Sequence, residues 1–214
     1  VGSINNGNPS LTNWGKLDLA AAFACLQKEY PNGQYHLVGH SAGGQLVGLM
    51  DNCHKLSSMF NFASSSGSLH YAKYPFRLKS AFYLKMFIPW SNMFFGQVNS
   101  QWVGMGEPLP KQVGKQWGKW CSGKGYVDVD LNSEIKEHHY DDLKLPTKWM
   151  YATDDDIANA DTVKDMIRVY SKIESEVVAL SPQELGFHDI GHMKFFSSRR
   201  KSLWPMALEW LKAH

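Results

Sequence analysis

One short segment, Gly39-His40-Ser41-Ala42-Gly43-Gly44, constrains the fold of this chain more than any other feature. It follows the apolar run Tyr35–Val38 and precedes a segment of helical composition. A strand, a G-x-S-x-G turn and a helix form a nucleophile elbow, which holds a serine hydroxyl exposed. We expect the backbones to approach closely at Gly39 and Gly43, because glycine carries no side chain. The pattern predicts that Ser41 is a nucleophile; the alternative is a glycine-rich turn with an incidental serine.

The rest of the hydrophobic pattern alternates between strand-like and helix-like segments. Besides 35–38, we expect strands at 59–63, 147–152 and 176–180, and helices at 14–28, from the elbow to about Asp51, at 161–172 and from Leu203 onward. Residues 1–13 have the composition of a loop. Successive strand–helix–strand units imply a parallel sheet flanked by helices, so the predicted fold class is α/β.

An aromatic-rich stretch, residues 72–144, interrupts this alternation and holds four of the eight tryptophans. Helical spacing is visible at Val113, Trp117 and Trp120. The stretch is either a helical layer with its own small core or a cap whose aromatic side chains grip an apolar substrate. We favour a helical cap insertion at 72–144, because it falls between two strands of a core formed by 1–71 and 145–214.

Composition excludes several classes of function. The formal net charge is only +2, which argues against nucleic-acid binding, and we interpret Arg199-Arg200-Lys201 as a solvated face. Three cysteines without C-x-x-C spacing argue for a reducing, cytoplasmic compartment. No stretch approaches the ~20 apolar residues that span a bilayer, so we expect no stable membrane insertion.

A serine nucleophile needs a base to accept its proton and an acid to orient that base. When the order along the chain is Ser, Asp or Glu, then His, the acid follows a later strand. Asp154, Asp155 and Asp156 follow the predicted strand at 147–152, and all three could instead be a solvated, helix-capping cluster. We choose Asp155.

Two histidines follow the predicted strand at 176–180, namely His188 and His192. We prefer His192 as the base because Gly191 precedes it and an aromatic pair follows; a structural histidine is the alternative. The carboxyl ends of parallel strands meet at one edge of a sheet, so the nucleophile, acid and base would lie close together.

An oxyanion hole requires two hydrogen-bond donors. One is expected to be the backbone N–H of Ala42, the residue after the nucleophile. The other should come from a loop after an earlier strand, and this sequence offers no candidate segment. We expect His40 to support the site by packing or hydrogen bonding.

The polar segment 137–142 (Glu-His-His-Tyr-Asp-Asp) could be imagined as a metal site. No ligand spacing within it supports that interpretation, and we interpret it as a solvated hinge. We therefore expect neither a metal nor a cofactor.

At these residues the chain resembles the α/β-hydrolase superfamily, in its branch of monoglyceride-lipase-like and serine-aminopeptidase-like proteins. It bears a closer resemblance to bacterial predicted α/β hydrolases at 39–45, 116–121 and 190–196, and at Leu203-Trp204-Pro205 and Trp210-Leu211. The resemblance covers most of the chain. It implies Ser41 as nucleophile, Asp155 as acid and His192 as base.

The sequence departs from these relatives in two ways. They tend to have a proline shortly after the acid, where this chain has Asn159. They also place several strands before the elbow, which implies about 60 to 90 further residues upstream. Without those strands Tyr35–Val38 would form an unpaired apolar edge, so we expect a second polypeptide segment or an oligomer contact to cover it.

The sequence thus predicts a serine hydrolase that cleaves an ester, thioester or amide of a small-molecule acyl substrate through an acyl-enzyme on Ser41. Transfer of the acyl group to an acceptor other than water is an alternative on the same residues. A second alternative is a non-catalytic protein of this fold, which would use the aromatic stretch to bind a ligand or partner.

Overall fold

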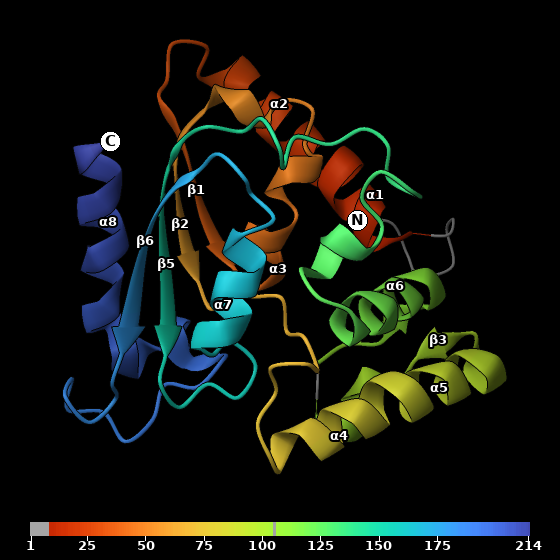
Figure 1. Ribbon diagram of the computed structural model, residues 1–214. Helices are drawn as coiled ribbons and strands as arrows, with labels where there is room; N and C mark the ends of the chain where they lie inside the picture. The colour runs from red at the N-terminus through yellow and green to blue at the C-terminus, as the bar shows by residue number, and fades with distance from the viewer. Residues whose placement is uncertain (1–8, 105) are drawn as a thin grey trace.

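A parallel sheet lies at the centre of the computed structural model, which describes residues 9–104 and 106–214. Its order is β1-β2-β5-β6, where the strands span Tyr35–His40, Leu56–Phe62, Pro146–Ala152 and Glu174–Leu180. Helix α8 (Trp204–Ala213) covers one face, and α3 (Ala42–Gln45) and α7 (Ala160–Ile167) lie on the other (Figure 1). The predicted α/β class with a parallel sheet is confirmed.

The first described helical segment begins earlier than the sequence pattern predicts. Helix α1 (Leu11–Asn13), a π-helical segment (Trp14–Leu19) and α2 (Ala20–Glu29) follow one another without a break. Ser10 caps the start, because its hydroxyl accepts the N–H of Asn13 at 3.1 Å. The loop expected over 1–13 therefore ends at Ser10, and its first eight residues lie outside the described ranges.

The helix after the elbow is shorter than expected. It was predicted to continue to about Asp51, but α3 ends at Gln45 and a 3₁₀ turn follows. Two tyrosine hydroxyls explain the break: Tyr140 donates to the carbonyl of Gln45 at 2.6 Å, and Tyr170 donates to that of Gly44 at 2.8 Å. These carbonyls would otherwise accept the N–H groups of a continuing α-helix.

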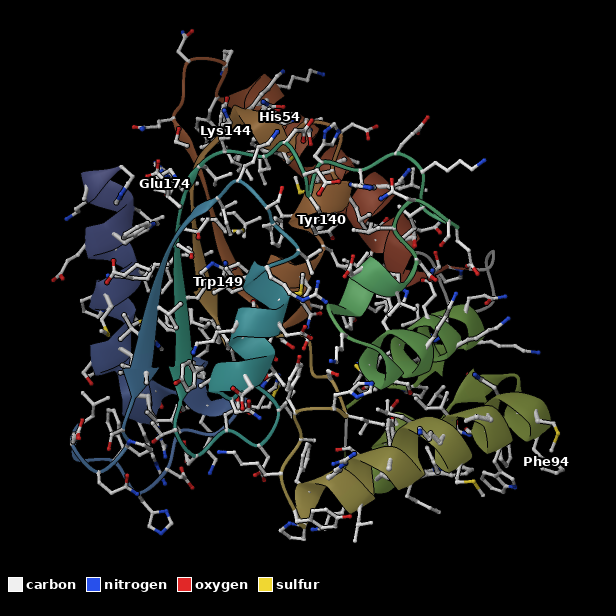
Figure 2. All side chains as sticks on the ribbon, viewed as in Figure 1. His54, Phe94, Tyr140, Lys144, Trp149 and Glu174 are labelled. Carbon is white, nitrogen blue, oxygen red and sulfur yellow. The ribbon has the colours of Figure 1, made fainter. Side chains whose placement is uncertain are left out.

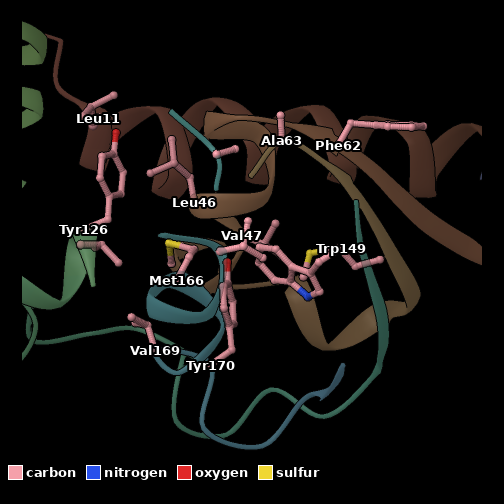
Figure 3. Packing of buried hydrophobic residues seen from close by; sticks show 14 of the residues in the cluster. Leu11, Leu46, Val47, Phe62, Ala63, Tyr126, Trp149, Met166, Val169 and Tyr170 are labelled. Atoms are coloured by element: carbon pink, nitrogen blue, oxygen red, sulfur yellow. The ribbon is translucent and has the colours of Figure 1, made fainter. Parts of the chain in front are cut away.

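The main core lies between the sheet and the layer of α3 and α7 (Figure 3). Trp149 of β5 is 1% exposed, and its indole N–H donates to the hydroxyl of Thr147 at 2.8 Å. Leu46 and Met166 are also buried. Each such side chain contributes about 1.5–3 kcal/mol when it is fully removed from water, so this layer holds the elbow firmly on the sheet.

Helices fill the stretch between β2 and β5, as predicted. They are α4 (Phe76–Phe82), a π-helical turn (Tyr83–Phe87), α5 (Ile88–Phe95) and α6 (Lys111–Ser122), with a small antiparallel pair, β3 (Gln97–Val98) and β4 (Leu109–Pro110). In Figure 1, α4, α5 and α6 lie to one side of the sheet. The division into a core and a cap at 72–144 remains a prediction.

The aromatic side chains of this stretch divide into two groups. Trp120 is fully buried, and its indole N–H donates to the buried carboxylate of Asp130 at 2.6 Å. Along the continuous helix of α4 and α5, by contrast, apolar side chains three or four residues apart are 45–71% exposed: Leu78, Phe82, Met86, Trp90, Met93 and Phe94. We call this row the apolar stripe; it occupies one face of the helix.

Strand β1 forms one edge of the sheet. Among the described residues it pairs only with β2, in parallel register from Tyr35 to His40, and Val38 is 45% exposed. An apolar strand edge with unpaired backbone groups invites another strand. We therefore propose that a second polypeptide segment or a contact with another copy covers it.

We expect the 214-residue chain to associate through this edge in a concentration-dependent way. Val38→Lys should weaken that association, because a charged side chain on an edge strand opposes pairing. Light scattering over a range of concentrations measures the effect. The matched control is Val177→Lys on β6, where the side chain is 44% exposed at the other edge. A monomer at every concentration, with fast amide exchange along the outer edge of β1, would contradict a contact with another copy.

All three cysteine thiols are free. Cys25 is exposed, whereas Cys121 is buried, and burial raises the pKa of its thiol to about 12. Across the two described ranges, no helix combines the length and the apolar character needed to cross a membrane.

Candidate active site

Ser41 occupies a sharp turn between β1 and α3. Its backbone dihedral angles, φ of +50° and ψ of −114°, lie in a region that residues other than glycine rarely adopt. Such a conformation costs on the order of 1–3 kcal/mol and persists only where its surroundings hold it. One restraint is direct, since the N–H of Ser41 donates to the carbonyl of Phe62 at the end of β2, at 3.0 Å.

Close packing at the elbow explains two of its three glycines. A Cβ on Gly39 would lie 2.7 Å from the nitrogen of Gly44 and 2.8 Å from Oδ1 of Asn61. A Cβ on Gly44 would lie only 2.2 Å from the same Asn61 oxygen. A Cβ on Gly43 would meet nothing within 4 Å. The steric expectation is therefore confirmed at Gly39 and wrong at Gly43, whose role Gly44 takes.

The structure brings Ser41, His192 and Asp155 into one chain of hydrogen bonds. Nδ1 of His192 lies 2.8 Å from Oδ2 of Asp155, and Nε2 lies 3.0 Å from Oγ of Ser41. A carboxylate only accepts, so Nδ1 carries the proton and Nε2 is left to accept the hydroxyl of Ser41. The three residues follow β1, β5 and β6, at the carboxyl end of the sheet.

The carboxylate of Asp155 is fully buried. Its second oxygen, Oδ1, accepts the backbone N–H groups of Ile157 at 2.8 Å and Ala158 at 3.0 Å. A buried charge requires such partners to offset its loss of hydration. Asp155 is thereby fixed in position, with Oδ2 directed at His192.

The neighbouring aspartates have different surroundings. The two carboxylate oxygens of Asp154 accept the N–H groups of Ile190 at 2.9 Å and Gly191 at 3.0 Å, so Asp154 holds the loop that carries His192. Asp156 is exposed. Of the three aspartates, Asp155 is the one that the structure pairs with His192.

The loop after β6 separates the two candidate histidines. His188 has a side chain that is 96% exposed and lies 3.4 Å from the carboxylate of Asp189. Gly191 adopts a φ of +54°, which suits glycine and turns the chain just before His192. Arg200, expected on a solvated face, instead has a side chain that is 11% exposed and donates through Nε to the carbonyl of Asp189 at 3.0 Å.

His40 supports the site from β1, as the sequence analysis expected. Its Nε2 lies 2.8 Å from the backbone carbonyl of His192, which can only accept, so Nε2 carries a proton. Burial lowers the pKa of the His40 imidazole. The ring of Phe196 packs edge-on against it, with centroids 5.4 Å apart. A neutral His40 thus holds the backbone of His192 without adding a charge.

Asn61 and Ser64, which are buried beneath the elbow, were not predicted from the sequence. Within the described ranges, both amide atoms of Asn61 and the hydroxyl of Ser64 have no hydrogen-bond partner. The available signal was Asn61, the one polar residue within the apolar run 59–63. Buried unpaired polar groups are rare and mark a place where the fold tolerates a cost.

Ala42 is the first residue of α3 and directly follows Ser41. The first N–H groups of a helix have no partner inside it, so its N–H is suited to stabilise negative charge. In the described part of the chain no strand precedes β1. The expectations that Ala42 supplies one oxyanion donor, and that the second comes from elsewhere, remain predictions.

No family model and no curated protein matches this sequence. Among solved structures, the chain is similar to a monoacylglycerol lipase from Paleococcus ferrophilus, at 12% identity and a TM-score of 0.54, covering 98% of this chain and 78% of that one. A structure described under the metagenome-derived lipolytic enzymes LipS and LipT gives 13% identity and a TM-score of 0.57, covering 96% and 75%.

A third similar structure is 2-hydroxy-6-oxo-6-phenylhexa-2,4-dienoate hydrolase from Rhodococcus, at 14% identity and a TM-score of 0.51, covering 97% of this chain and 74% of that one. These likenesses extend over nearly the whole chain, although the sequence identities are only 12–14%. They show that this chain has the α/β-hydrolase fold.

Proposed function

We propose that this chain, which has the α/β-hydrolase fold, is a serine hydrolase that cleaves an ester, thioester or amide through an acyl-enzyme on Ser41. One observation carries the proposal: the continuous hydrogen bonds from Ser41 through His192 to the buried carboxylate of Asp155. A serine hydroxyl becomes nucleophilic when a positioned base accepts its proton and an acid orients that base.

The geometry supports the following steps. Nε2 of His192 accepts the hydroxyl proton while Oγ of Ser41 attacks the acyl carbon, and Asp155 stabilises the resulting imidazolium. The N–H of Ala42 would stabilise the oxyanion that forms. His192 then returns the proton to the leaving group, and a water molecule activated by the same base hydrolyses the acyl-enzyme.

The substrate class that we propose is a small molecule with an apolar acyl group. Its support is the exposed apolar stripe along α4 and α5. Figure 2 labels one member of the stripe, Phe94, at the end of α5 that is far from the sheet. The names of two structural neighbours, a monoacylglycerol lipase and lipolytic enzymes, agree with such a substrate. Hydrolysis rates for p-nitrophenyl esters of graded chain length, compared with aminoacyl amides, would rank the candidates.

We expect a fluorophosphonate probe to label the native protein covalently at Ser41, because the probe reacts only with activated serines. Ser41→Ala should abolish labelling, whereas His188→Ala should retain it, since that side chain projects into solvent. Gel fluorescence and peptide mass spectrometry measure the adduct. Labelling that persists in Ser41→Ala, or a folded wild type that is never labelled, would favour a non-catalytic binding protein instead.

A further inference from the structure

A second group of chemically reactive side chains lies at the end of the sheet opposite to Ser41. Cys53 and His54 belong to a short turn directly before β2, and His139 and Asp142 belong to the segment that precedes β5. Figure 2 shows His54 beside the end where the strands begin, whereas Ser41 follows the end of β1. We call these four residues the Cys–His cluster.

Cys53, His54 and His139 bring their ligating atoms within 4.8 Å of one another, and Asp142 lies beside the two imidazoles. Nε2 of His54 lies 3.0 Å from Nδ1 of His139, and Oδ1 of Asp142 lies 3.4 Å from that Nδ1 and 3.7 Å from that Nε2. The sulfur of Cys53 lies within 4.8 Å of a nitrogen of each imidazole.

These separations resemble those of a tetrahedral zinc site. Nitrogen or oxygen ligands at about 2.0–2.1 Å from Zn²⁺ are about 3.3–3.4 Å apart when the geometry is tetrahedral. A thiolate at about 2.3 Å would lie about 3.6 Å from each nitrogen. The nitrogen and oxygen atoms, which are 3.0–3.7 Å apart, lie within about 0.4 Å of this spacing. The sulfur of Cys53, within 4.8 Å of each nitrogen, would move closer to them when an ion binds.

We propose that Cys53, His54, His139 and Asp142 bind one Zn²⁺ ion. A sulfur with two imidazole nitrogens and one carboxylate oxygen suits Zn²⁺, whereas Ca²⁺ and Mg²⁺ prefer sites made of oxygen alone. On binding, the Cys53 thiol loses its proton to solvent and forms a Zn–S bond. The thiolate and carboxylate then balance the charge of the ion, and both histidines remain neutral.

The backbone holds this cluster in place before any ion binds. The N–H of His139 donates to the carbonyl of Gly48 at 2.7 Å, and the carbonyl of His139 accepts the N–H of Leu143 at 3.0 Å. The side chains of His54 and Asp142 are 45% and 55% exposed, so an ion can reach the site from solvent. Rigid backbone and an open approach both favour binding.

The bound ion would have a structural role. Four protein ligands close the coordination sphere and leave no position for a substrate, unlike the open sites of zinc hydrolases. The ligands connect the turn before β2 with the segment before β5, and these two strands are neighbours in the sheet. Zinc would therefore hold the starts of β2 and β5 together. The far end of β2 contacts the elbow, and Asp155 follows the far end of β5.

The sequence concealed this cluster because its halves are far apart. His54 and His139 are separated by 85 positions, so no ligand spacing is visible within either segment. The proposal thus departs from the sequence-based expectation, which was a solvated hinge at 137–142 and no metal. The inference is independent of the proposed hydrolase activity.

Titration of chelator-treated protein with Zn²⁺ and with Co²⁺ tests the proposal. We expect one ion per chain, a rise in the thermal unfolding temperature with Zn²⁺, and a thiolate-to-metal absorption band with Co²⁺. Loss of an outer-shell partner alone typically weakens metal binding by about 10–100-fold. Removing a ligand in His54→Ala or His139→Ala should thus cost about 100-fold or more.

Matched controls separate ligand loss from general damage. Cys53→Ser should remove the Co²⁺ absorption band, whereas Cys25→Ser should keep it. Asp142→Asn should weaken binding, whereas Asp141→Asn, at an exposed neighbouring position, should not. His54 is partly exposed, so its variants should fold, which circular dichroism verifies. Equal affinity in wild type and His54→Ala, or a Co²⁺ spectrum without the thiolate band, would overturn the proposal.

Discussion

Under the proposed mechanism, Asp155→Asn should lower the rate of ester hydrolysis by about 10⁴-fold, as loss of the acid does in enzymes with a Ser-His-Asp triad. The carboxylate of Asp155 accepts the Nδ1–H of His192 at 2.8 Å. An asparagine there can present an N–H to the ring, which favours the tautomer that cannot accept the proton of Ser41. It also leaves the imidazolium without a balancing charge. The measurement is kcat/KM for a p-nitrophenyl ester.

The run of three aspartates supplies controls for this prediction. Asp156→Asn removes an exposed carboxylate and should leave kcat/KM within about twofold, which is the scale of most surface substitutions. Asp154→Asn weakens two hydrogen bonds that position the loop of His192, so its effect should be intermediate. A rate in Asp155→Asn within tenfold of the wild type, with the fold intact, would remove Asp155 from the proposed mechanism.

The hydrogen-bonded arrangement of Ser41, Asp155 and His192 could be predicted because it depends on short motifs and on their order along the chain. Ser41 is marked by glycines and by the strand before it, and His192 by Gly191 and its place after the last strand. The sequence favoured Asp155 but did not exclude Asp154 or Asp156, because the register within the run 154–156 depends on how the chain turns after β5. The buried contacts of Asp155 with Ile157 and Ala158 resolve that register.

Other features depend on contacts between distant residues and left little trace in the sequence. Helix α3 ends early because Tyr140 and Tyr170, about a hundred positions away, take its carbonyls. The Cys–His cluster likewise exists only once the segments before β2 and β5 are side by side. A local sequence pattern reports only the spacing of residues within one segment, whereas these features are produced by tertiary packing.

The glycines of the elbow show the same limit. Sequence reasoning gave Gly39 and Gly43 equal weight, yet the space around a glycine depends on the strand beneath it. Asn61 of β2 lies against Gly39 and Gly44 and leaves Gly43 free. Substitution of each of the adjacent glycines 43 and 44 by alanine is therefore an informative comparison, because the surroundings are open at Gly43 and crowded at Gly44.

Gly44→Ala should destabilise the protein by about 3 kcal/mol or more, which is the upper range for overpacking a core. The new methyl would lie 2.2 Å from Oδ1 of Asn61 and 2.5 Å from Oγ of Ser64. Both side chains are buried, so neither can move into solvent. At about 2–4 °C per kcal/mol for a domain of this size, the unfolding temperature should fall by roughly 10 °C.

Gly43→Ala is the matched control, because its methyl meets nothing within 4 Å. It should leave stability unchanged or raise it by up to about 1 kcal/mol, since alanine is the better helix former. The double variant Gly44→Ala/Asn61→Ala tests the cause: removing the amide makes room for the methyl, so the two effects should be strongly non-additive. If Gly43→Ala and Gly44→Ala lower the unfolding temperature equally, or if the double variant is simply additive, then contact with Asn61 is not what requires glycine at position 44.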